Sequence, residues 1–201
     1  MVVDLSTATA EELAAAGRGL GRLGGRTDGG RGHLLMAGGR ESDARLEKES
    51  AAADVAVAVE AAGGGAVDDL AAAIAEALRG LAGVPGRRVA VVVTDGARRS
   101  DREAWRRAAE AADQAGAPLL VTGLWSGRFD PGIRRQLREL AATTGGRLFL
   151  VQGAAGLETM LEEYGMLLDA AVSLRFAEGG GEVRLEATRP ELEVRAPRRI
   201  R

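Results

Sequence analysis

Val89-Ala-Val-Val-Val-Thr-Asp-Gly96 is the stretch that decides the fold, because it combines a buried strand with a polar turn. Residues 89–93 are wholly apolar and mostly β-branched, which is the pattern of a strand buried on both faces. Strands of this kind belong to parallel sheets that helices cover on both sides. The rest of the chain is therefore expected to supply such helices.

Apolar strands and amphipathic helices alternate on both sides of this segment. Strands are predicted at 1–5, 33–37, 55–59, 119–124 and 148–151. Helical stripes of apolar residues separate most of them, and such alternation predicts βαβ units. From residue 171 the apolar period changes to two, with turns at 179–181 and 189–190, which predicts a small antiparallel unit.

The predicted fold class is α/β, a three-layer, doubly wound and mostly parallel sheet with a small C-terminal antiparallel β unit. Residues 1–170 form the α/β domain and 171–201 form a C-terminal β-strand extension. Helix starts are predicted at capping boxes, Thr9 with Glu12 and Ser100 with Glu103, and at Asp130 followed by proline. The glycines of 17–25 predict a frayed helix end, since a dinucleotide loop would have to follow a strand.

Composition excludes several classes of function. The net charge is −2, which gives no electrostatic case for nucleic acid. Cysteine is absent and His33 is the single histidine, so a zinc cluster and a Ser-His-Asp triad have no support. No apolar run approaches the roughly 20 residues of a membrane span, so the chain as given is expected to be soluble. The compartment is left open, because a start at Met1 directly on the first strand suggests a truncated N-terminus.

Polar residues follow two strands that are candidates for neighbours in the sheet. In open parallel sheets, ligands bind beyond the carboxyl ends of the strands, where the strand order reverses. Asp4 and Ser6 follow the first strand and Asp95 follows the strand at 89–93. If those strands are adjacent, the three side chains converge, and carboxylates with a hydroxyl suit Mg²⁺. The alternative is that the two aspartates are helix caps or turn residues.

Three motifs in order resemble a von Willebrand factor A (VWA) domain: Asp4-Leu-Ser-Thr-Ala8, Gly63-Gly-Gly-Ala-Val-Asp-Asp-Leu70 and Val91-Val-Val-Thr-Asp-Gly96. The second half, including Gln136-Leu-Arg-Glu-Leu-Ala-Ala-Thr-Thr-Gly-Gly-Arg-Leu-Phe-Leu150, is similar to the bacterial VWFA-related group. The resemblance spans nearly the whole chain. It implies a doubly wound domain with an antiparallel edge strand, which fits the predicted strand at 55–59.

The resemblance also implies a metal ion-dependent adhesion site, and this chain departs from it at two positions. Asp4, Ser6 and Asp95 match the family's ligands, whereas Ala8 replaces a serine and Gly65 replaces a threonine. With two hydroxyl ligands missing, we expect Mg²⁺ binding to be weak or absent.

Aromatic residues suggest a contact surface on the same rim. Trp125 and Phe129 follow the strand at 119–124, so they could contact a protein partner. The alternative is that at least one of them fills the core, as we expect for Trp105 on a helical stripe.

The resemblance therefore implies a non-catalytic protein–protein interaction domain with a partner of unknown identity. One alternative is a Mg²⁺-dependent phosphoryl-transfer or hydrolase enzyme that uses Asp4 and Asp95. Against it, Lys48 is the only lysine and lies in a charged segment far from these residues in sequence. A further alternative is a purely structural, degenerate domain.

Overall fold

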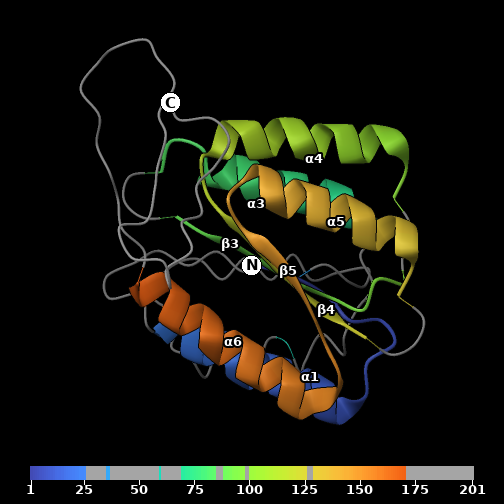
Figure 1. The fold of residues 1–201 in the computed structure, drawn as a ribbon, viewed down its shortest axis with the longest axis vertical. Coiled ribbons are helices and arrows are strands. Elements are labelled where there is room, and N and C mark those ends of the chain that lie inside the picture. The colour runs from blue at the N-terminus through green and yellow to red at the C-terminus, as the bar shows by residue number, and fades with distance from the viewer. Residues whose placement is uncertain are drawn as a thin grey trace, which may run out of the picture.

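The computed structural model describes residues 1–25, 35–36, 59, 69–84, 88–97, 100–125 and 129–170. These residues form one parallel sheet with helices on both faces (Figure 1). The strands are β1 (Val2–Asp4), β2 (Leu35–Met36), β3 (Ala90–Thr94), β4 (Leu119–Leu124) and β5 (Arg147–Val151). Their order in the sheet is β2-β1-β3-β4-β5, and every pairing is parallel.

Two layers of helices enclose the sheet. Helices α1 (Ala10–Gly25) and α6 (Gly153–Asp169) cover one face. Helices α3 (Leu70–Leu81), α4 (Arg102–Ala115) and α5 (Pro131–Thr143) cover the other face. The α/β class and the parallel sheet predicted from the sequence are confirmed. None of the described helices has the length and apolarity of a membrane span.

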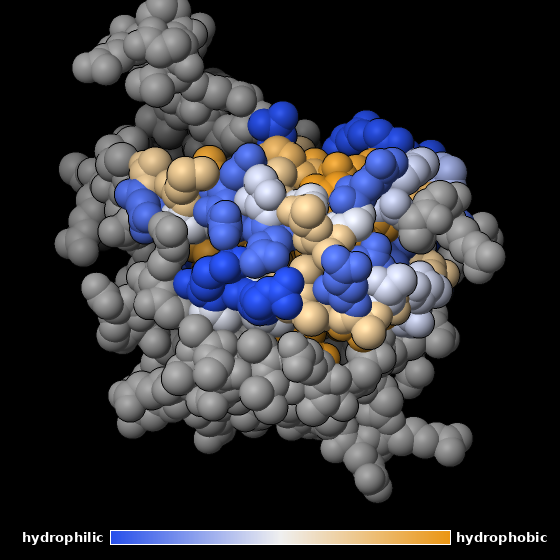
Figure 2. Space-filling model, turned by 90° about the horizontal axis from the view of Figure 1, so that it is seen from below, coloured by the Kyte–Doolittle hydropathy of each residue, from blue (hydrophilic) through white to orange (hydrophobic). Residues whose placement is uncertain are grey.

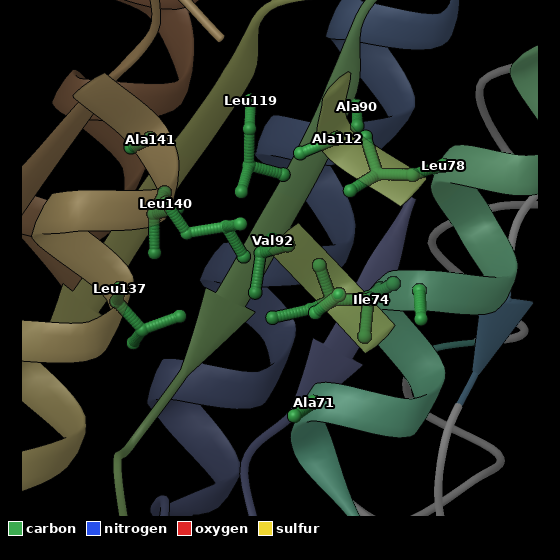
Figure 3. Close-up of a cluster of buried hydrophobic side chains, with 14 of the residues drawn as sticks. Ala71, Ile74, Leu78, Ala90, Val92, Ala112, Leu119, Leu137, Leu140 and Ala141 are labelled. Carbon is green, nitrogen blue, oxygen red and sulfur yellow. The ribbon is translucent and has the colours of Figure 1, made fainter. Parts of the chain in front are cut away.

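The alternating side chains of β3 show why residues 90–93 had to be apolar. Ala90 and Val92 belong to the core cluster beneath α3, α4 and α5, which Figure 3 shows around Val92 and Leu119. Val91 and Val93 belong to the second core cluster, beneath α1 and α6. All five residues of β3 are buried, because successive side chains point to opposite faces and both faces are covered.

One predicted strand is wrong at the position that can be checked. Val59 is helical and fully buried in the cluster beneath α1 and α6. Strand preference depends strongly on context, and burial against neighbouring helices overrides it here. Residues 55–58, and with them the rest of the expected antiparallel edge strand, lie outside the described residues. The C-terminal β unit at 171–201 does so too.

Two of the three predicted helix starts are confirmed. The Thr9 backbone N–H donates to Glu12 Oε2 at 2.8 Å, and Glu12 N donates to Thr9 Oγ1 at 3.3 Å. Asp130 caps α5 by accepting from the backbone N–H groups of Gly132 and Ile133.

The predicted capping box at Ser100 and Glu103 is wrong. Asp101 caps α4 by accepting from Ala104 N at 2.6 Å. Glu103 pairs with Arg106 instead. The Ser100 hydroxyl accepts from Ala71 N at 2.9 Å, so it caps the neighbouring helix α3. Spacing along the chain cannot reveal this, because the donor belongs to a helix 29 residues away.

A buried hydroxyl pair connects α6 to β4. Thr122 Oγ1 on β4 donates to the hydroxyl of Tyr164 on α6 at 2.8 Å. Both residues are fully buried, and burial raises the pKa of the Tyr164 hydroxyl above its ordinary value. The neutral phenol is therefore the form that this contact holds.

The glycine-rich end of α1 remains helical to Gly25, so the expected fraying is wrong. The reason is close packing against α6. Gly19 is buried, and a Cβ added there would lie 2.5 Å from Leu161 Cδ1.

At the surface of this face, Arg18 and Arg22 donate to Glu158, and these bonds lower the pKa of the Glu158 carboxyl. Figure 2 views this face and shows hydrophilic residues gathered in its middle, with hydrophobic residues on either side.

Gly19→Ala is expected to destabilise the domain by about 1–3 kcal/mol, because the added methyl group forces α1 and α6 apart. Gly80→Ala is a matched control on α3, since no atom lies within 4 Å of a Cβ added there. That control should gain about 0.5–1 kcal/mol from the higher helix propensity of alanine. Urea unfolding of both variants measures the difference. Equal stability of the two would contradict the tight contact of α1 with α6.

Candidate functional site

Two buried aspartates lie at the carboxyl ends of adjacent strands. β1 pairs with β3, and Asp4 lies in register with Thr94, the residue before Asp95. From β1 the chain goes outward to β2 on one side, whereas β3 lies on the other, so the strand order reverses here. Asp4 is 0% exposed and Asp95 is 1% exposed. The predicted convergence at the switch point is therefore present.

The Asp95 carboxylate joins the loop after β1 to the loop after β3. Its Oδ2 accepts from Ser6 Oγ at 3.3 Å, from Thr7 N at 2.6 Å and from Thr7 Oγ1 at 2.9 Å. Its Oδ1 accepts from Ala97 N at 3.0 Å. Four donors from the chain itself thus hold this carboxylate in place.

Asp4 is connected to the same cluster through Thr94. The Thr94 hydroxyl donates to Asp4 Oδ2 at 3.0 Å and accepts from Gly96 N at 3.0 Å. The backbone N–H of Asp95 donates to the Asp4 carbonyl at 2.9 Å. Asp4 therefore takes part in setting the turn that presents Asp95.

The fit of this cluster to Mg²⁺ is poor as the side chains are arranged. Each carboxylate oxygen offers about two lone-pair sites, and Asp95 Oδ2 accepts three hydrogen bonds whereas Oδ1 accepts one. A cation would have to displace donors to reach Oδ2, so access to this carboxylate is restricted to Oδ1. Within the described ranges, no group of three or more His, Cys, Asp or Glu residues could hold a metal ion.

Sequence reasoning missed Thr7 and Thr94, which supply three of the hydrogen bonds above. Thr7 lies between Ser6 and Ala8, and Thr94 directly precedes Asp95. The only signal for them in the sequence was a hydroxyl residue next to a matched motif position. Ala8, where the resembling family has a serine, packs against the core cluster beneath α1 and α6. Gly65 lies outside the described residues.

The two rim aromatics lie together, but they differ in access. Their rings are stacked, with centroids 6.5 Å apart and planes at 9°. Phe129 is buried at 4% exposure, whereas Trp125 is 37% exposed. Phe129 therefore fills the core, the alternative considered for one of the pair. Of the two, only Trp125 is accessible at the surface.

The Phe129 ring packs against two glycines, Gly96 and Gly123. A Cβ at Gly96, which has a φ of 63°, would lie 2.7 Å from the ring, and a Cβ at Gly123 would also lie 2.7 Å from it. Asp130 N donates to the Gly96 carbonyl at 3.3 Å. The turn that carries Asp95 and the loop that carries Trp125 are thus packed into one continuous rim.

Beside Trp125 lies an open depression of about 470 Å³, lined by Trp125, Arg134, Leu150 and Gln152. It sits at the carboxyl ends of β4 and β5, at the first turns of α5. The guanidinium carbon of Arg134 lies 5.9 Å from the centroid of the Trp125 ring. The depression therefore combines an aromatic face with a positive charge.

The structure accordingly describes an α/β parallel sheet whose carboxyl-end rim holds a fixed carboxylate and an exposed tryptophan. No protein-family model matches the sequence, and no curated protein matches it either.

Proposed function

We propose that this chain is a non-catalytic protein–protein interaction domain of VWA type, with a weak or absent Mg²⁺ site. The observation that carries the proposal is the Asp95 carboxylate, which four donors of the chain already satisfy. The order of motifs and the convergence of Asp4, Ser6 and Asp95 at the switch point support the family resemblance. The hydrogen bonds that Asp95 accepts support the view that the loops of this rim keep their conformation without a metal ion.

Burial of the aspartates favours binding over catalysis. A phosphoryl-transfer or hydrolase site needs carboxylates that reach a metal-bound substrate or water. Asp4 and Asp95 are almost completely buried, and hydrogen bonds with neighbouring residues engage both of them. These side chains are best suited to stabilise the loops of the rim, while other, exposed residues contact the partner.

Trp125 is the residue on this rim best suited to contact a partner. Tryptophan is enriched among residues that dominate binding energies, because it brings a large apolar area with a polar N–H. Here the buried ring of Phe129 supports it from below and Arg134 lies over it. The ring is therefore held in place before a partner arrives, which lowers the entropic cost of binding.

Trp125→Ala is expected to weaken partner binding by about 2 kcal/mol, roughly thirtyfold in Kd. Candidate partners are captured from a lysate of the source organism on immobilised wild-type chain, identified, purified and titrated by calorimetry. Leu167→Ala is the matched control, because Leu167 is also a large exposed apolar residue but lies on α6. A purified partner that tolerates Trp125→Ala and is lost with Leu167→Ala would place the interface elsewhere.

A further inference from the structure

Arg134 is an arginine whose interactions within the domain are incomplete. It is half-buried in the first turn of α5, and among the described residues its buried Nε has no hydrogen-bond partner. A buried donor without a partner is unfavourable, so it calls for an explanation. The guanidinium is held over the Trp125 ring, at the wall of the open depression.

The helix that carries Arg134 has two further arginines. Arg135 and Arg138 follow on the same helix and are exposed, and Glu139 is the only acidic residue within α5. The ion pairs seen between α1 and α6 and within α4, in the part of the chain that the structure describes, involve none of these three arginines. Asp130, four residues before Arg134, accepts from the start of α5 as its cap.

We propose that the depression beside Trp125 binds an acidic side chain of a protein partner, with Arg134 as the residue that recognises the carboxylate. A guanidinium matches a carboxylate with two parallel hydrogen bonds. The terminal amino groups of Arg134 can supply these two hydrogen bonds and the positive charge. Leu150 and the exposed part of the Trp125 side chain accommodate an apolar residue beside the acidic one.

This inference rests on the proposed interaction function and adds the chemistry of the partner. It requires no metal ion, because the positive charge comes from Arg134. It also differs from a general attraction to polyanions, since the chain as a whole carries a net charge of −2. The specific contact therefore has to come from the arrangement of Arg134 and Trp125.

The test titrates the purified chain with fluorescein-labelled decapeptides of Glu, Leu and Gly, and measures fluorescence anisotropy. Companion peptides carry Gln or Lys at the Glu positions, and a labelled oligothymidine reports binding to phosphates. The variants are Arg134→Gln and Arg134→Lys. The matched control is Arg107→Gln, which removes the same charge from an exposed position on α4.

We expect the Glu peptide to bind at least tenfold more tightly than the Gln peptide. Arg134→Gln should weaken it at least tenfold, Arg134→Lys should weaken it less, and Arg107→Gln should change it less than twofold. Circular dichroism melting checks that the variants stay folded. If Arg134→Gln does not fold, the affinity of Arg134→Lys for the Glu peptide, compared with that of wild type, tests the inference.

Equal binding of the Glu and Gln peptides would overturn the inference, and so would equal losses for Arg134→Gln and Arg107→Gln. If the oligothymidine binds more tightly than the Glu peptide, the inferred ligand is a nucleic acid and not an acidic protein segment. If the peptides fail while Trp125→Ala still disrupts a purified partner, the interaction function stands and only the acidic chemistry is wrong.

Discussion

Phe129→Ala is expected to lower the free energy of unfolding by about 4 kcal/mol, because it removes a buried ring and leaves a cavity. The ring is seated on Gly96 and Gly123 and stacks under Trp125. Its loss therefore leaves the loop after β4 and the turn after β3 without their shared contact. Urea unfolding followed by circular dichroism measures the change.

Phe129→Leu is the control, since it keeps an apolar side chain of intermediate volume. It should cost less than the alanine variant and keep most of the affinity for a partner. Under conditions where Phe129→Ala remains folded, its partner affinity should fall as well, because Trp125 has lost its support. An unfolding free energy for Phe129→Ala within about 1 kcal/mol of wild type would contradict the buried position of the ring.

Asp95→Ala is expected to cost about 3 kcal/mol, because four donors lose a charged acceptor, each such bond contributing about 1.5–3 kcal/mol, while water replaces it for the donors of the exposed Ser6 and Thr7. Thr7 alone would be left with two donors to satisfy. Asp95→Asn keeps one oxygen acceptor and should fall between wild type and the alanine variant. Thermal melting of the three proteins measures the order.

The same melts with and without millimolar Mg²⁺ test the metal site. A ligand stabilises the folded state in proportion to the logarithm of its concentration relative to Kd. Because the Asp95 carboxylate is already satisfied, we expect the wild-type Tm to rise by less than about 1 °C on addition of Mg²⁺. A large, saturable increase that Asp95→Ala abolishes would show that Mg²⁺ displaces the internal donors.

Local patterns predicted most of the described elements because their causes are local. The caps at Thr9 and Asp130 depend on donors within three residues, and sequence spacing is sufficient to find them. Ser100 failed as a cap of α4 because its partner, Ala71, belongs to another helix. The glycines of α1 were read as weak points, whereas the contact of Gly19 with Leu161 gives one of them a packing role.

The candidate site, too, could be predicted from the sequence only in part. Its aspartates could be found because the carboxyl ends of parallel strands meet at one edge of the sheet. The donors that satisfy Asp95 could not be counted from the sequence, since Thr7 lies 88 residues away and its direction depends on the turn. The different access of Trp125 and Phe129 also depends on Gly96, in the turn after β3, and on Gly123 in β4.

The sequence by itself determined the alternation of strands and helices, the buried central strand and the position of Asp4 and Asp95 at strand ends. It could do so because periodicity and burial act over a few neighbouring residues. Only the tertiary structure decided that Asp95 is satisfied internally, that Phe129 is core while Trp125 is surface, and that Arg134 lies over Trp125. The first depends on donors that lie 88 and 89 residues from Asp95 and meet it only at the edge of the sheet. The other two depend on the path of the chain around neighbouring residues, which residue types alone do not determine.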